Sequence, residues 1–530
     1  MKSLFDILIR GGTVIDGTGR EGFRADVAVS GGAVAAVGQL AHAPARRVIE
    51  AGGKLVTPGF IDIHRHADAA AFRPGFGRLE LCQGLTTIVN GNCGLGAAPF
   101  GGEHAAAIRA YLAPITGDIP RELPTESMAA YLGALHELPI HCGMLAGAGV
   151  IRAAAAGYDL PRLEEGHYRA IHRALETSLA EGAMGVSLGL GYAPECFYTT
   201  PELVRALAPL ANSGIPLTVH MRQEGAGVVQ SVEELLAVAR ALKCPVHISH
   251  LKAMGRSNWN DKVPRVLALL QRAREEGLAV SCDAYPYTAG STQLLHILPP
   301  EFLEGGMEAA VARLADPAVR RELARRIESG AGFDDIAKLA GWDGIYLTGL
   351  HCPEDHPYQG KNLAEIAALM HESPLDSCCD LLTREHGQIT MIDFMACEED
   401  ICAILRSPLS HVISDATYPT EGRPHPRVYG TFTHFLEHFV REKNILPIEE
   451  AIYKLTGRPA EVLGLKRKGR LEAGYDADVC VFSLRALHEN ATYQEPEQLS
   501  QGMDYVLVSG QPALEEGRPT GLCAGRAIRR

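Results

Sequence analysis

The 530-residue sequence lacks several features that define other broad classes of protein. It has no run of about 18 apolar residues, so no membrane-spanning helix and no membrane partner are expected. It has no excess of basic residues either: 50 Lys and Arg stand against 63 Asp and Glu, a formal charge of −13. Because nucleic-acid binding needs a basic surface, a nucleic acid is not an expected partner.

The sequence also lacks the marks of a secreted protein. Asp6 interrupts the first residues before an apolar segment develops, so no signal peptide is expected. The 13 cysteines are an odd number and follow no framework spacing. We therefore expect reduced thiols and a cytoplasmic location. The oligomeric state stays open, with a homo-oligomer among the alternatives.

What is present is the composition of a globular protein. Apolar residues make up 46% and charged residues 21%, which excludes extensive disorder. The length allows a large barrel together with an accessory domain.

Both ends of the sequence are rich in short strands separated by glycine turns. Short segments at both ends either alternate apolar with polar residues or are continuously apolar, as strands do. They are 6–17, 25–29 and 33–37 at the N-terminal end, and 477–482 and 505–508 at the C-terminal end. The pattern predicts one small β-sandwich domain formed from residues 1–57 and 466–530. A central domain of residues 58–465 would lie between these two segments.

The central part repeats a unit of short apolar strand, loop and amphipathic helix. Expected helices include 163–181, 201–213, 231–243 and 262–277. Eight strands are expected, at 59–66, 86–93, 141–149, 184–191, 215–222, 244–251, 278–287 and 411–417. This alternation predicts an α/β fold with a (β/α)₈ TIM-like barrel. The segment from about 295 to 410 is too long for one crossover, so it is expected to carry an inserted helical subdomain between strands 7 and 8.

Polar side chains stand where these strands are expected to end. They are His64, His66, Cys93, His220, His250 and Asp415. The active sites of such barrels lie at the C-terminal ends of the strands. His64 and His66 are two residues apart, so both can point to the same side of a strand. Neutral imidazoles and a thiolate are ligands suited to zinc, and a carboxylate beside the metal can act as a base.

Several longer motifs resemble those of the amidohydrolase superfamily and, within it, the N-acyl-D-amino-acid deacylases, or D-aminoacylases. The matching stretches follow the order of that family and span nearly the whole chain. They are TPGFIDIHRH at 57–66, GLTTIVNGNCG at 84–94, HISHLK at 247–252, DAYPYTAGST at 283–292, Ser414-Asp415, HPRVYG at 425–430 and GYDAD at 474–478.

The resemblance implies a role for each matching residue. Cys93, His220 and His250 would hold one tightly bound Zn²⁺, and His64 and His66 would offer a second, weaker position that Cys93 could bridge. Asp415 would be the catalytic acid and base. The residues implied to hold the substrate are Lys252, Tyr192, Tyr285, Ser291 and Arg427.

The resemblance further implies hydrolysis of an N-acyl-D-amino acid to a D-amino acid and a carboxylate. Zinc would polarise the amide carbonyl, and Asp415 would move the proton from water to the leaving amine. The fork of Arg427 and the charge of Lys252 suit an α-carboxylate. The alternative is another linear or cyclic amide at the same metal site, and the preference for a D-amino acid comes from the resemblance alone.

The sequence departs from the family pattern between and after the two histidines. Arg65 and Ala67 stand there, where relatives usually carry a small polar residue and an acid. Arg65 would face the helical layer, so it needs a buried partner or an exit to water.

The sequence also allows three competing interpretations. Residues 185–189 match the G-x-S-x-G nucleophile motif, but Gly191 and Pro194 follow where that motif needs a helix. Residues 434–438 match the H-x-x-E-H motif of a zinc peptidase, but they lie within an amphipathic helical pattern. A non-catalytic scaffold on the same fold would be expected to lose ligands, and this sequence keeps every candidate.

Overall fold

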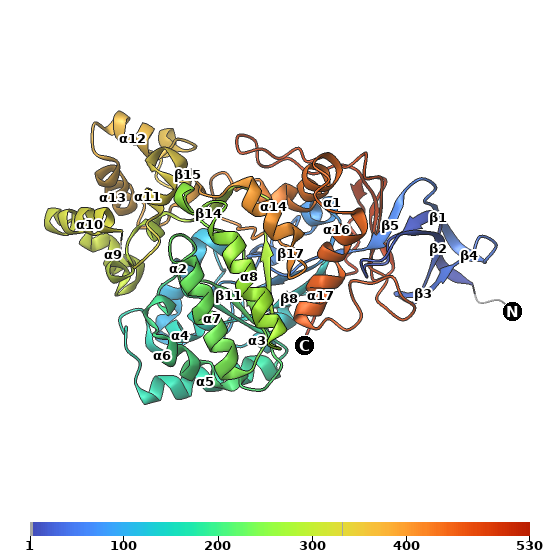
Figure 1. Cartoon of the computed structure of the whole chain (residues 1–530), viewed down its shortest axis with the longest axis horizontal. Coiled ribbons are helices and arrows are strands. Elements are labelled where there is room, and N and C mark those ends of the chain that lie inside the picture. Colours follow the sequence, from blue (N-terminus) through green and yellow to red (C-terminus); the bar gives the residue numbers. More distant parts are fainter. Residues whose placement is uncertain (1–3, 331) are drawn as a thin grey trace.

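A computed structural model describes residues 4–330 and 332–530. Three parts follow one another along the long axis of the molecule (Figure 1): a β domain at one end, a barrel in the middle and a mostly helical insertion at the other end. No helix among the described residues is long and apolar enough to cross a membrane.

Eight parallel strands form the barrel. They are β6 (Phe60–Asp62), β7 (Leu85–Asn90), β8 (His141–Met144) continued by β9 (Ala146–Gly147), β10 (Val186–Gly189), β11 (Leu217–His220), β12 (Val246–Ile248), β13 (Val280–Ala284) and β17 (Ser410–Val412). The first and last strands meet where His66 N–H donates to the Ala416 carbonyl, 2.9 Å away. Each overlaps a segment predicted as a strand, and β7 and β17 begin one residue before the predicted bounds, so the barrel prediction is confirmed.

Helices surround the barrel and bury one face each. In α5 (Glu165–Ala180), Tyr168, Ile171, Leu175 and Ser178 are buried at spacings of three and four residues. The other helices outside the insertion are α1 (Arg78–Cys82), α2 (Ala105–Thr116), α3 (Met128–Ala134), α4 (Ala148–Ala156), α6 (Thr200–Ala206), α7 (Val228–Leu242), α8 (Lys262–Glu275), α14 (Glu398–Arg406), α15 (Arg427–His434), the π-helix Phe435–Glu442, α16 (Ile448–Leu455) and α17 (Gly457–Leu463).

The two ends of the chain share one nine-stranded sheet, as expected for a β domain built from both. Strand β5 lies between β1 and β18, and Val56 of β5 is paired with Val481 of β18. Apolar side chains from both ends enclose a core of their own, separate from that of the barrel. The strands are β1 (Phe5–Val14), β2 (Phe23–Ser30), β3 (Ala33–Gly38), β4 (Ala45–Glu50), β5 (Leu55–Pro58), β18 (Val479–Phe482), β19 (Met503–Val508), β20 (Gln511–Glu515) and β21 (Arg518–Pro519).

The insertion contains the expected helices and also a small antiparallel sheet that the sequence did not predict. The sheet has the order β14 (Ala289–Gln293), β16 (Thr390–Phe394), β15 (Ile345–Gly349). Because β14 starts at Ala289, the chain leaves the barrel before residue 295. The helices are α9 (Gly306–Arg313), α10 (Pro317–Ser329), α11 (Ile336–Ala340), α12 (Leu363–Met370) and α13 (Pro374–Arg384).

Arg65 is fully buried and has the partners that its position requires. Its guanidinium donates to Asp62 at 3.1 Å, to Glu80 at 3.2 Å and to the Tyr418 hydroxyl at 2.7 Å. The two carboxylates compensate the charge that burial would otherwise disfavour. Arg65 therefore joins β6, α1 and the loop after β17, on the outer side of the strand that carries His64 and His66.

Candidate active site

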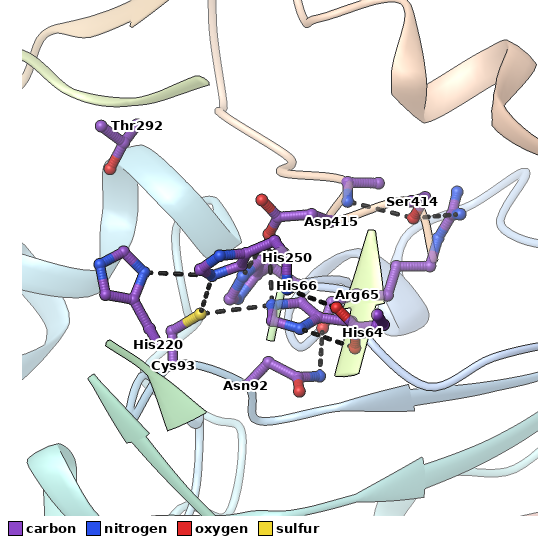
Figure 2. A network of polar contacts seen from close by, with 12 residues as sticks. His64, Arg65, His66, Asn92, Cys93, His220, His250, Thr292, Ser414 and Asp415 are labelled. Carbon is purple, nitrogen blue, oxygen red and sulfur yellow. Dashed lines mark hydrogen bonds and ion pairs between the residues drawn. The ribbon is translucent and has the colours of Figure 1, made fainter. Parts of the chain in front are cut away.

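The six polar residues predicted at the strand ends converge on one place, at the C-terminal mouth of the barrel (Figure 2). His220 ends β11, and the other five follow the ends of β6, β7, β12 and β17. Cys93, His250 and Asp415 have positive φ angles of 54°, 36° and 51°. Non-glycine residues adopt this conformation at a cost, and such strain concentrates at functional sites.

Cys93, His220 and His250 form one group with the geometry of a zinc site. His220 Nδ1 lies 3.1 Å from His250 Nε2, and Cys93 Sγ lies 3.5 Å from the same nitrogen. Zinc–ligand bonds of 2.0–2.3 Å in a tetrahedron place ligand atoms about 3.3–3.6 Å apart, so these atoms need little movement. Burial holds the pKa of both imidazoles well below its ordinary value, which leaves them neutral as metal ligands must be.

A second group contains His64, His66, Asp415 and again Cys93. Cys93 Sγ lies 3.2 Å from His64 Nε2, and Asp415 Oδ1 lies 3.3 Å from Nε2 of each histidine. Cys93 is thus common to both groups. Burial raises the pKa of the Cys93 thiol to about 11, so its ionisation would be coupled to the binding of a cation.

The second oxygen of Asp415 faces Arg427. Arg427 Nη1 lies 2.9 Å from Asp415 Oδ2, and Nη2 donates to the Ser291 carbonyl at 3.0 Å. Although Asp415 is buried, the Arg427 guanidinium holds the pKa of its carboxyl well below the usual range. Among the described residues, Arg427 Nε has no acceptor and Nη1 makes no hydrogen bond beyond its ion pair with Asp415, which leaves N–H groups of the fork, Nε–H among them, for a ligand.

The predicted substrate-holding residues line a cavity of about 300 Å³ beside these groups. The Tyr285 ring lies under both cations, 5.8 Å from Lys252 Nζ and 4.9 Å from the Arg427 guanidinium. The Tyr192 ring packs 4.3 Å from that of His220, and its hydroxyl lies 3.4 Å from Thr292 Oγ1. Ser291 lies in β14, so the insertion supplies one wall of the cavity.

Glu224 belongs to the site but was not predicted from the sequence. Its carboxylate lies 2.9 Å from His250 Nδ1, 2.6 Å from Lys252 Nζ and 3.9 Å from His220 Nε2. A carboxylate behind a histidine ligand fixes the ring and its tautomer. Although burial opposes the charge of Lys252, the Glu224 carboxylate raises the pKa of that amine. The only feature of the sequence that could have indicated Glu224 is its position, four residues after His220.

Asp283 is a second supporting carboxylate that the sequence motif contained without a stated role. It accepts a hydrogen bond from the backbone N–H of His250, whose φ is positive. Its other oxygen lies 2.7 Å from His247 Nε2. Asp283 therefore holds the backbone turn that directs His250 toward Cys93.

The competing motifs do not form catalytic sites. Ser187 is fully buried in β10, where it donates to the Gly91 carbonyl and accepts from Gly94 N–H at 3.0 Å. His434 and His438 pair with different carboxylates, Glu489 at 2.6 Å and Glu398 at 3.3 Å. Neither histidine belongs to a group of metal-ligating atoms in residues 4–330 or 332–530.

Comparisons with known proteins agree with this geometry. The model of the amidohydrolase family matches residues 47–514. A D-aminoacylase of Alcaligenes xylosoxydans xylosoxydans is 34% identical over 532 residues, covering 99% of this chain and 98% of that protein. An N-acyl-D-glutamate deacylase of the same organism is 36% identical, with 100% and 98% covered.

A solved structure extends the comparison to the fold. It is an N-acyl-D-glutamate deacylase from Bordetella bronchiseptica, complexed with zinc and a phosphonate inhibitor that mimics the tetrahedral intermediate. It is 32% identical, covers 100% of both chains and has a TM-score of 0.83. The resemblance inferred from the motifs is confirmed. The chain belongs to the amidohydrolase family and is a metal-dependent hydrolase of amide bonds.

Proposed function

We propose that this protein hydrolyses the amide bond of N-acyl-D-amino acids with the help of zinc, giving a D-amino acid and a carboxylate. The observation that carries the proposal is the pair of ligand groups that share Cys93, with Asp415 at 3.3 Å from two of the histidines. Support for the substrate class comes from the relatives named D-aminoacylase and N-acyl-D-glutamate deacylase.

For the metal, we propose that Cys93, His220 and His250 hold the tightly bound zinc. His64 and His66, with Cys93 as a bridge, would form a second and weaker position. When bound, zinc supplies Lewis acidity to the substrate carbonyl and to water.

The proton transfers belong to Asp415. Its low pKa keeps the carboxylate ionised at neutral pH, so it can accept a proton from water as the oxygen attacks the amide carbon. The same carboxyl then returns the proton to the nitrogen as the carbon–nitrogen bond breaks. Water is consumed, and one amine and one carboxylate are formed.

The substrate is held through its α-carboxylate. Arg427 offers the free Nε–H, Lys252 offers an ammonium group, and the Tyr285 hydroxyl lies on the same wall of the cavity. Charge-assisted hydrogen bonds of this kind fix orientation as well as adding affinity. Ser291 and Tyr192 would line the space around the reacting amide.

The test is a panel of racemic N-acetyl amino acids incubated with zinc-loaded protein, with chiral chromatography of the products. The proposal is supported if D-amino acids are released and L-amino acids are not. No release from protein with measured zinc would overturn it and leave other linear or cyclic amides as substrates.

We also propose a cytoplasmic location. The 13 cysteines all lie in the part of the chain that the structure describes, and none of them is in a disulfide there.

A further inference from the structure

The cavity contains a buried carboxyl group that the proposed reaction does not use. Asp393 lies in β16, the middle strand of the small sheet in the insertion, and it is paired in register with Gly290 of β14. A methyl group on Gly290 would lie 2.9 Å from Asp393 Oδ1 and 3.3 Å from the Tyr285 hydroxyl. The absence of a side chain at Gly290 therefore leaves room for the Asp393 carboxyl beside Tyr285.

Neither oxygen of Asp393 has a hydrogen-bond partner among the described residues, although the residue is only 1% exposed. A buried polar group without a partner costs about 1–3 kcal/mol, so native proteins rarely leave one. Burial raises the pKa of the Asp393 carboxyl to about 7. Because the side chain lines the cavity, a bound molecule can supply the missing donor.

The cations of the cavity are already paired. Arg427 faces Asp415 at 2.9 Å, Lys252 faces Glu224 at 2.6 Å, and Arg222 faces Glu234 at 3.0 Å. By contrast, Asp393 and Asp334 face the cavity without a cation partner among the described residues. Among residues 4–330 and 332–530, Asp334 accepts hydrogen bonds only from backbone N–H groups, those of Glu224 and Gly225. The unpaired charge in the cavity is thus negative.

We propose that Asp393 selects substrates whose side chain carries a cation, such as N-acyl-D-lysine or N-acyl-D-arginine, and disfavours acidic side chains. This inference rests on the function proposed above. Long cationic side chains combine an apolar stem with a charged head, and the cavity offers matching surfaces. The apolar residues that line the cavity include Met254, Leu298, Leu303, Phe333, Ile336 and Met395.

The parts that all N-acyl-D-amino acids share bind elsewhere. The reacting amide lies beside Asp415, which belongs to the ligand groups, whereas Asp393 belongs to none of them. The α-carboxylate has no donor to offer and binds the cations. What is left for Asp393 is the substituent on Cα. An acidic side chain there would bring a negative charge toward two carboxyls that have no cation in ion-pair contact within the described residues, which disfavours it.

The experiment compares kcat/KM for N-acetyl-D-lysine, N-acetyl-D-methionine and N-acetyl-D-glutamate, with zinc-loaded wild type and D393N. Methionine serves as a neutral side chain of similar length. We expect wild type to favour lysine over methionine by at least about tenfold and over glutamate by at least about a hundredfold. In D393N, the ratio of kcat/KM for the lysine substrate to kcat/KM for the methionine substrate should fall about tenfold or more.

Controls separate the possible results. D343N alters an exposed acid that precedes β15 outside the cavity, and it should keep the wild-type ratio. Zinc content and thermal unfolding show whether D393N is folded. An equal decrease in kcat/KM for all three substrates in D393N would mean that Asp393 contacts a group that the three substrates share. That result overturns the inference but not the proposed function. If wild type with zinc cleaves none of the three, the inference is overturned, and the wider panel described above decides the proposed function.

Discussion

Arg427 and Asp415 face each other across the mouth of the barrel, with 2.9 Å between Nη1 and Oδ2. The residue proposed to bind the substrate carboxylate therefore also neutralises the residue proposed to move the proton. Substrate binding and proton transfer depend on one guanidinium group.

Replacement of Arg427 by lysine should impair both steps. A single ammonium cannot reach Asp415, the Ser291 carbonyl and a substrate carboxylate together, as the guanidinium fork can. We expect kcat/KM to fall about a hundredfold, or ~2.7 kcal/mol, with a higher KM and a lower kcat. Steady-state kinetics with an N-acetyl-D-amino acid measure this effect. R423K, in the preceding loop, is the matched control and should differ little from wild type.

Replacement of Asp415 by asparagine should remove turnover without removing zinc. The amide keeps the shape of the side chain but cannot accept the proton, a contribution of about 10²–10⁴ in rate. Zinc content measured by atomic absorption should stay at the wild-type level if Cys93, His220 and His250 hold the metal. A near-normal rate for this variant is incompatible with the proposed role of Asp415.

Replacement of Glu224 by glutamine tests the residue that the sequence did not indicate. The carboxylate supports His250 and neutralises Lys252, so its loss should weaken zinc binding and activity by about 10–100-fold. Competition with a chromogenic chelator measures the metal affinity directly. E233Q, on the exposed face of α7, provides the control. Unchanged zinc affinity in E224Q would limit Glu224 to a role at Lys252.

Substrate selectivity should depend on pH through Asp393. Its carboxyl is buried, which raises the pKa to about 7; Lys252 and Arg427 oppose this shift, and Glu224 adds to it. Above that pH the group is ionised and attracts a cation, and below it the group is neutral. The lysine-to-methionine ratio of kcat/KM should therefore increase from about pH 6 to about pH 8. In D393N the increase should be clearly smaller, because only Asp334, whose pKa burial also raises to about 7, still ionises in the cavity over this range.

Asp478 should stabilise the junction between the β domain and the barrel. Although burial opposes its charge, Lys468 at 2.6 Å and His141 at 3.1 Å hold the pKa of its carboxyl well below the usual range. A lowered pKa in the folded state gives stability that is present above the unfolded pKa of about 3.9 and is lost as pH falls below it.

We expect D478N to lower the free energy of unfolding by about 3 kcal/mol at neutral pH, because it leaves Lys468 without this partner. The difference from wild type should stay constant between about pH 7 and pH 5 and narrow below about pH 4. Urea unfolding at several pH values measures it. D504N, which removes a partly exposed partner of Lys54, should cost less than about 1 kcal/mol. An equal decrease in the free energy of unfolding in D478N and D504N would contradict the stabilising role of Asp478 at the junction.

The barrel and the polar residues at its mouth could be predicted from the sequence because both depend on local patterns. Apolar runs mark the strands, and the polar residues that end five of these runs lie at the same mouth of the barrel, as His220 and Asp415 show. The need of Arg65 for buried partners also followed from its place between two inward-facing histidines.

Residues that join the site through long loops could not be predicted. Glu224 lies in a loop after β11, and nothing in its spacing shows that it turns back to His250 and Lys252. Asp393 lies in an insertion whose small sheet pairs β14 with a strand about 100 residues later. Periodicity describes a face of one element, whereas these contacts depend on how distant segments pack.

The sheet shared by the two ends of the chain has a consequence for synthesis. Strand β5 pairs with β18, which lies about 420 residues further along the chain. At about 5–20 residues per second, a ribosome needs about 20–80 seconds to make the intervening sequence. Throughout that time one edge of β5 has no partner strand, and the apolar core around Val56 and Val481 cannot close. The nascent chain thus carries an open sheet edge for most of its translation, the state in which chaperones bind and strands aggregate.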